Sequence, residues 1–124
     1  MITFYYDISV VSCKQAVQWF EEYKIEINKK RIERISKKDL IRILSLSENG
    51  FHDVLKSLNK SGARLTEQVK IIERLGFADA IDFVVSHTNV LRTPIVMDEH
   101  KLVIGYNAEN MRVFLSREYR DEIK

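Results

Sequence analysis

Four short segments of the chain carry the β-branched and aromatic residues that are typical of strands. A helical pattern separates the first two, residues 2–6 and 25–32, and a polar turn separates the last two, residues 95–97 and 102–104. A strand, a helix and a second strand form a right-handed unit with parallel strands, whereas two strands about a turn form an antiparallel hairpin. The pattern predicts a mixed four-stranded sheet.

Capping signals predict where the first two helices begin and end. Ser12 and Gln15 have the spacing of a capping box, so we expect the first helix to begin at Ser12. Ser36 and Asp39 have the same spacing before a second apolar stripe, which stops near Gly50. We expect Gly50 to cap that helix in a left-handed conformation.

The middle of the chain continues the helical period. Residues 51–58 predict a short helical turn, and residues 65–85 predict two helices with a break at Gly76. Asn107 is a favourable N-cap for a last helix. The expected order is βαβ, then helices, then ββα, which is an α/β fold.

Composition narrows the class of protein. A length of 124 residues suits one domain, and 45% hydrophobic with 31% charged residues excludes a disordered chain. A net charge of +2 is too weak to imply nucleic acid. The sequence has no apolar run of ~18 residues and no pattern of a signal peptide, so we expect a cytoplasmic protein with no membrane partner.

Cys13 is the one cysteine, which excludes an internal disulfide and a multi-cysteine zinc site. The first turn of a helix and the neighbouring Lys14 favour a reactive thiolate. A small buried hydrophobe at a tight turn is an equally good interpretation, because free cysteines are often buried. His52, His87 and His100 are far apart in the sequence, so we predict no metal site.

The element order, a cysteine after the first strand and a proline before the third resemble a thioredoxin-like fold with a helical insertion. Over nearly the whole chain the sequence resembles the ArsC family, and within it the Spx-type transcription regulators. The motifs that carry the resemblance are Ser12-Cys13-Lys14, Ser47-Glu48-Asn49-Gly50, Leu91-Arg92-Thr93-Pro94-Ile95-Val96-Met97-Asp98, Gly105-Tyr106-Asn107 and Phe114-Leu115.

This resemblance implies one domain over residues 1–124, with a thioredoxin-like part at 1–34 and 89–118 and an insertion at 35–88. It also implies a regulator, not an enzyme, that binds the C-terminal domain of the RNA polymerase α subunit and needs no cofactor. In Spx a glycine at the place of Gly50 lies on the surface that meets this domain. The neighbouring polar residues would then form the rim of the contact: Ser47, Glu48 and Asn49.

Two departures from the family pattern affect the expected chemistry. In the Spx family that this sequence resembles, the proteins that sense disulfide stress carry a Cys-x-x-Cys motif at this turn. Val10 stands here at the position of the first cysteine, so we expect no intramolecular disulfide switch. The Arg that precedes the proline in arsenate reductases is replaced by Thr93, with Arg92 one residue earlier. The alternative function is an arsenate reductase-like thiol oxidoreductase that uses Cys13 with glutathione or glutaredoxin.

Further partners follow from smaller features. We expect Pro94 to be a cis-proline that shapes the loop beside Cys13, and adducts of small-molecule thiols at Cys13 are a second way to sense redox state. The densest basic segment favours a charged edge strand over DNA binding, so DNA is expected only as an indirect or weak partner. Its residues are Lys29, Lys30, Arg31, Arg34, Lys37 and Lys38.

Overall fold

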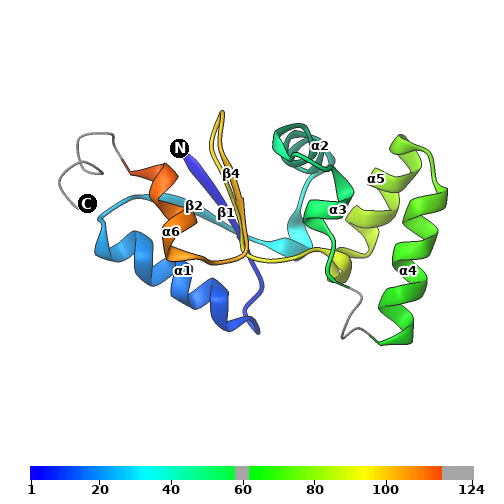
Figure 1. The fold of residues 1–124 in the computed structure, drawn as a ribbon, viewed down its shortest axis with the longest axis horizontal. Coiled ribbons are helices and arrows are strands. Elements are labelled where there is room, and N and C mark those ends of the chain that lie inside the picture. The colour runs from blue at the N-terminus through cyan, green and yellow to red at the C-terminus, as the bar shows by residue number, and fades with distance from the viewer. Residues whose placement is uncertain (58–61, 116–124) are drawn as a thin grey trace.

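The computed structural model describes residues 1–57 and 62–115. Its elements are, in chain order, β1 (Ile2–Tyr6), α1 (Val11–Glu22), β2 (Ile27–Arg31), η1 (Ile32–Arg34), α2 (Lys37–Leu46), α3 (Phe51–Val54), α4 (Ala63–Arg74), α5 (Phe77–Ser86), η2 (Thr88–Val90), β3 (Ile95–Met97), β4 (Leu102–Ile104), α6 (Ala108–Met111) and η3 (Arg112–Phe114). The η elements are short 3₁₀ helices. Figure 1 shows the sheet between two groups of helices, with α1 and α6 on one side and α2 to α5 on the other.

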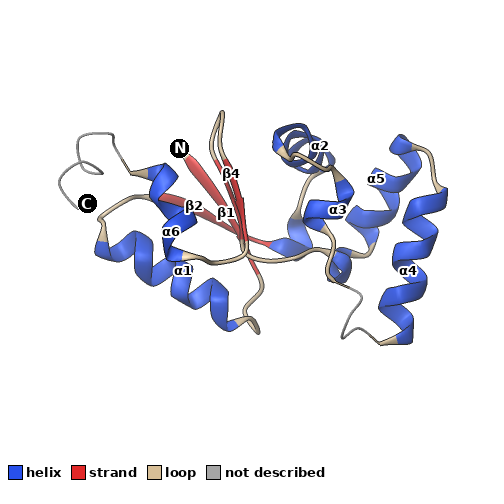
Figure 2. Ribbon diagram, in the orientation of Figure 1, coloured by secondary structure: helices blue, strands red, loops and turns tan. Residues whose placement is uncertain are grey.

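The sheet has four strands in the order β2-β1-β3-β4 (Figure 2). β1 runs parallel to β2, with Phe4 opposite Lys29, and antiparallel to β3, with Phe4 opposite Val96. β3 and β4 form an antiparallel hairpin in which Val96 faces Val103. The predicted mixed sheet is therefore confirmed, with the basic strand β2 at one edge.

Alternation along the strands sends neighbouring residues to opposite faces of the sheet. Phe4, Val96 and Val103 belong to a buried cluster with α1, α6 and the segment after α6. Aromatic rings dominate this cluster: Phe20 meets Phe4 edge-on with ring centroids 6.2 Å apart, and Trp19 at 5.2 Å. We call this side of the sheet the aromatic face.

The residues next to these along the strands, Tyr5, Ile95 and Met97, lie in a second cluster. We call this side the insertion face, because α2 to α5 cover it. Their buried contributions include Leu40, Ile43, Val69, Ile72, Ile81 and Val84. The division of the domain at residues 34 and 89 stays a prediction, and residues 116–118 of its last part lie outside the described residues.

The helix boundaries confirm some predicted caps and correct one. The Ser36 hydroxyl accepts a hydrogen bond from the Asp39 N–H at 3.0 Å, and the Asn107 side chain accepts from Glu109 and Asn110. The capping box at Ser12 is wrong, because α1 begins at Val11 with Val10 as its N-cap and no side-chain cap. The turn that Asp7 and Ser9 form before the helix sets its direction instead.

Two other expectations are corrected. The second strand ends at Arg31 and not at residue 32, because Ile32 begins a 3₁₀ turn whose side chain is buried. Gly50 does not cap α2, whose C-cap is Ser47; it is the N-cap of the short helix α3. Its φ of +60° is positive, but its ψ of −130° lies outside the left-handed helical region. The break at Gly76 is confirmed, since α5 begins directly after it.

Candidate functional site

Cys13 lies in the first turn of α1, where its N–H donates to the Val10 carbonyl at 3.1 Å. Its side chain is only 3% exposed and belongs to the aromatic cluster, together with Phe4 and Trp19. The geometry matches a small hydrophobe at a strand-to-helix turn. A thiol in this position has little access to solvent, and thiol reactivity requires access.

An Asx turn shapes the approach to Cys13. The Asp7 carboxylate accepts hydrogen bonds from the Ser9 N–H at 2.9 Å and the Ser9 hydroxyl at 2.7 Å. These bonds, led by the hydroxyl, lower the pKa of Asp7. A hollow of about 420 Å³ beside the turn is lined by Cys13, with Asp7, Lys14 and Lys29 among its charged and polar neighbours. The turn therefore sets the direction of α1 without any help from Ser12.

The loop before β3 contains a cis peptide bond. The Thr93–Pro94 bond is cis, as predicted, and the Pro94 carbonyl accepts from the Gly105 N–H at 2.8 Å. Arg92 is exposed, and its guanidinium donates to the Asp53 carbonyl at 3.3 Å. Arg92 and Cys13 line different hollows. Alternation in the extended chain explains this separation, since neighbouring side chains point to opposite sides.

Residues Ser47, Glu48, Asn49 and Gly50, which we call the 47–50 loop, connect α2 and α3. Glu48 and Asn49 are exposed. A Cβ atom at Gly50 would meet nothing within 4 Å, so this residue faces open space. The positive φ of Gly50 is a conformation that residues with a side chain rarely adopt. The loop thus places a residue without a side chain on an open surface.

The Asp53 carboxylate holds this loop in place. It accepts from the Asn49 N–H at 2.9 Å and from the Asn49 amide group at 3.3 Å. The backbone hydrogen bond is the main reason why the pKa of Asp53 is lowered. A residue of α3 therefore fixes the shape of the surface next to Gly50.

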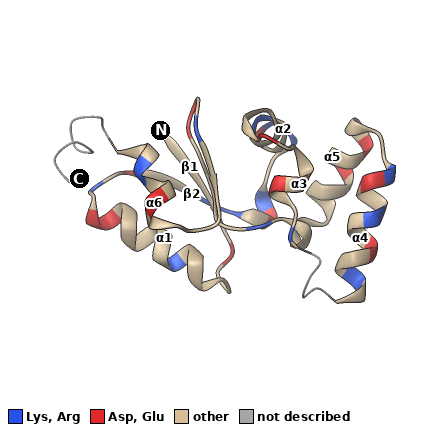
Figure 3. Ribbon diagram, viewed as in Figure 1, with Lys and Arg blue, Asp and Glu red and all other residues tan. Residues whose placement is uncertain are grey.

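Three of the six basic residues around β2 form ion pairs. Lys30 lies 3.7 Å from the Asp39 carboxylate, Arg31 lies 3.0 Å from Glu33, and Lys37 lies 2.6 Å from Asp82. Figure 3 shows residues of both signs spread over the elements on the two sides of the sheet. These partners reduce the positive charge that the segment offers to phosphates.

Histidine and acidic residues form no metal-binding group in the described part of the chain. His87 stacks on the Phe83 ring at 4.1 Å and contacts the Phe83 carbonyl at 2.8 Å, and His100 lies in the exposed turn after β3. Within residues 1–57 and 62–115, every helix is too short or too polar for a membrane-spanning segment.

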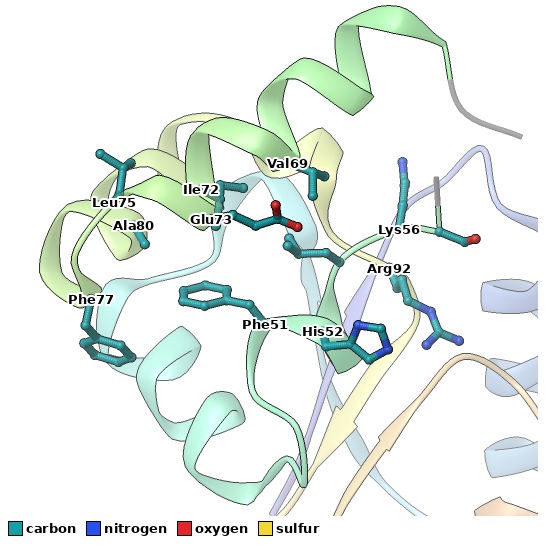
Figure 4. A pocket seen from close by; sticks show the side chains of 12 residues that line it. Phe51, His52, Lys56, Val69, Ile72, Glu73, Leu75, Phe77, Ala80 and Arg92 are labelled. Carbon is teal, nitrogen blue, oxygen red and sulfur yellow. The ribbon is translucent and has the colours of Figure 1, made fainter. Parts of the chain in front are cut away.

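Two features of the insertion face were missed by sequence reasoning. The first is a polar tie from β1 to α2, in which the Tyr5 hydroxyl donates to the Asp39 carboxylate and Lys30 lies 5.9 Å from the Tyr5 ring centroid. Burial is the largest cause of a raised pKa for the Tyr5 phenol, followed by Asp39. The second is a hollow of about 1020 Å³ between α3, α4 and α5 (Figure 4). Neither has a local sequence signal, because each joins residues that are distant in the chain.

The strand order, the cis-proline and the cysteine at the start of α1 define a thioredoxin-like α/β fold with a helical insertion. Solved structures agree: an arsenate reductase from Vibrio cholerae matches 92% of this chain and 97% of its own with a TM-score of 0.72 at 15% identity. A possible arsenate reductase from Streptococcus mutans matches 98% of both chains with a TM-score of 0.68 at 22% identity.

The ArsC family profile matches residues 5–114, and the chain belongs to the ArsC family. A curated relative from Streptococcus pyogenes, named "Global transcriptional regulator Spx", is 33% identical over 98% of this chain and 90% of its own length. A relative of the same name from Streptococcus pneumoniae is 32% identical over 98% and 91%. This similarity places the chain with the Spx-type transcription regulators, while the reductase structures leave its enzyme status open.

Proposed function

We propose that this protein modulates transcription by binding the C-terminal domain of the bacterial RNA polymerase α subunit through the 47–50 loop. The main support is the open position of Gly50, in a family whose relatives are named as global transcriptional regulators. A partner can approach the backbone closely there, because no Cβ stands in the way. The exposed side chains of Glu48 and Asn49 supply the polar rim that is usual at such contacts.

The proposed regulator acts without an intramolecular disulfide. Cys13 is the one cysteine of the sequence, and Val10 stands three residues before it as the N-cap of α1. The thiol is also buried among aromatic side chains. The amount of the protein, and not its oxidation state, then sets its effect.

Arsenate reduction is the alternative, and the site gives it little support. Such chemistry needs an accessible thiolate and a cation that holds the oxyanion. Cys13 is 3% exposed, Thr93 precedes the proline, and the Arg92 guanidinium donates to the Asp53 carbonyl. We therefore favour protein binding over catalysis.

Calorimetric titration of the whole protein with the isolated α C-terminal domain tests the proposal. We expect a dissociation constant in the micromolar range or tighter, and a loss of about tenfold or more for Gly50→Arg. Gly50→Ala separates backbone strain from steric obstruction. Gly76→Arg is the matched control, because Gly76 also faces open space but has an ordinary φ of −65°.

The outcomes are distinct. Tight binding that survives Gly76→Arg and fails with Gly50→Arg supports the proposed contact, and Cys13→Ala is expected to bind like the wild type. No binding of the wild-type protein, oxidised or reduced, overturns it. Turnover of arsenate with glutathione and glutaredoxin that Cys13→Ala abolishes would instead establish the reductase.

A further inference from the structure

The large hollow on the insertion side plays no part in the proposed polymerase contact. Its walls come from α3, α4, α5 and the segment before β3, and Figure 4 shows Glu73 and Phe51 extending into the space between them. Its volume, about 1020 Å³, is at the upper end of the range for small-molecule sites. An open space of this size beside a packed core requires an explanation.

One end of the hollow is aromatic and aliphatic. The rings of Phe51 and Phe77 lie 6.3 Å apart with an interplanar angle of 50°, and Phe77 is 57% exposed. Ile72 and Ala80 are buried and form the floor beside them. A large exposed ring beside an apolar floor leaves surface that a ligand with an apolar side chain can cover.

The hollow also holds charges of both signs. In Figure 4 the Glu73 carboxylate points into the middle of the space. Lys56, His52 and Arg92 lie on the side away from Phe77, with the Lys56 amine and the Arg92 guanidinium pointing in opposite directions. Neither Glu73 nor Lys56 forms an ion pair with another described residue. The hollow therefore has three zones along its length: an apolar zone, a negative zone and a positive zone.

We propose that this hollow binds an apolar amino acid or a short apolar peptide as a zwitterion. The apolar side chain lies against Phe51 and Phe77, the ammonium group meets Glu73, and the carboxylate meets Lys56. Charge complementarity carries the assignment: a simple organic anion leaves Glu73 facing it without a partner, and a neutral apolar ligand leaves both signs unpaired.

Matched ligands test this assignment without a known physiological ligand. The probe is the dipeptide leucyl-phenylalanine, compared with its N-acetyl form, which lacks the ammonium group, and its C-terminal amide, which lacks the carboxylate. By calorimetry on the whole protein we expect saturable binding of the dipeptide with a dissociation constant below about 1 mM. Each capped form is expected to bind about fivefold more weakly or worse.

Variants assign each charge to its partner. In Glu73→Gln the N-acetyl form and the free dipeptide are expected to bind equally, and in Lys56→Gln the penalty for amidation is expected to shrink. Glu67→Gln and Lys70→Gln are controls, because both residues are exposed on α4 and do not line the hollow. All four changes are at exposed or partly exposed sites, and circular dichroism checks their folding.

Three results overturn the proposal: no saturable binding of the dipeptide, equal binding of all three probes, or a penalty for capping that persists in Glu73→Gln and Lys56→Gln. Tighter binding of the N-acetyl form would assign the hollow to organic anions instead. Because none of these readouts involves RNA polymerase, they are independent of the function proposed above.

Discussion

The two faces of the sheet are built from alternate residues of the same strands, yet they differ in how completely they are filled. The aromatic face joins Phe4, Trp19 and Phe20 into one ring cluster that also encloses Cys13. The insertion face buries more residues, but it includes the polar tie between Tyr5 and Asp39 and opens into the large hollow. Cys13, which the resemblance singles out, therefore lies on the aromatic face beside the smaller hollow of about 420 Å³, and the larger hollow lies on the insertion face.

This contrast teaches where a ligand can be accommodated in this molecule. Ring clusters leave few voids, and burial among them makes Cys13 part of the core. On the insertion face, α3, α4 and α5 leave room between them. Four substitutions test the contrast, from the largest expected effect to the smallest.

The largest effect is expected from Phe20→Ala on the aromatic face. Phe20 is 1% exposed, and its removal should lower the free energy of unfolding by about 3–5 kcal/mol. Leu40→Ala, fully buried on the insertion face, should cost about 2–5 kcal/mol. Urea unfolding, followed by circular dichroism and by fluorescence of Trp19, measures both.

The two probes decide whether the faces unfold together. Trp19 is the one tryptophan and lies on the aromatic face, so its fluorescence reports that face alone. We expect both probes to give the same midpoint in Leu40→Ala, because the strands are shared. A fluorescence midpoint that stays at the wild-type value in this variant would show two independent units.

A smaller effect is expected from Tyr5→Phe, which removes the hydroxyl of the polar tie. The loss should be about 1–2 kcal/mol at pH 8, since Asp39 loses a hydrogen-bond donor. Burial and Asp39 raise the pKa of Tyr5 above its ordinary 10.0. The stabilisation is therefore complete below pH 10 and is lost as pH rises through the higher folded value.

Urea unfolding of the wild type and of Tyr5→Phe between pH 8 and 11 tests whether this stabilisation falls as the pH rises. The difference in unfolding free energy between wild type and Tyr5→Phe should shrink above pH ~10. All other residues are the same in the two proteins, so their contributions cancel in the difference. A difference that stays constant over this range would contradict the assignment.

The smallest effect is expected from Asp53→Asn at the rim of the insertion side. Asp53 is half-exposed at the rim, so global stability should change little, but the 47–50 loop should loosen. Hydrogen bonds from Asn49 lower the pKa of Asp53 below 3.8. The ordering they provide is present above pH 3.8 and is lost as pH falls through the lower folded value.

The Asn49 amide proton reports this directly in an NMR titration. Its chemical shift should change with a midpoint below 3.8 in the wild type, and this step should be missing in Asp53→Asn. A wild-type midpoint at or above 3.8 would show that Asp53 does not hold the loop.

Local sequence patterns predicted most of the fold because they depend on neighbours along the chain. The hairpin at residues 95–104, the cap at Asn107 and the break at Gly76 are all of this kind. Ser12 failed as a cap because the Asx turn at Asp7 sets the chain direction first. Such competition between two short polar signals is not visible in either signal alone.

The candidate site was less predictable, because its parts meet only in three dimensions. Alternation in an extended segment explains why Arg92 and Cys13 line different hollows. The burial of Trp19 was missed, although Trp19 lies three residues after the buried Ala16 on α1. The tie between Tyr5 and Asp39 spans 34 positions, and the hollow joins four separate segments. No periodicity encodes such contacts.

An isolated β-bridge makes it possible to measure how fast the insertion separates from the segment that leads into the sheet. Leu55 and Leu91 form an isolated antiparallel bridge, in which the Lys56 N–H donates to Val90 at 2.9 Å and the Arg92 N–H to Val54 at 2.8 Å. Both amides are protected only while the chain after α3 stays on the segment that leads into β3. The hydrogen-exchange rates of the two amides therefore report how often the two segments separate. Equal protection of both amides would indicate that they open in one event.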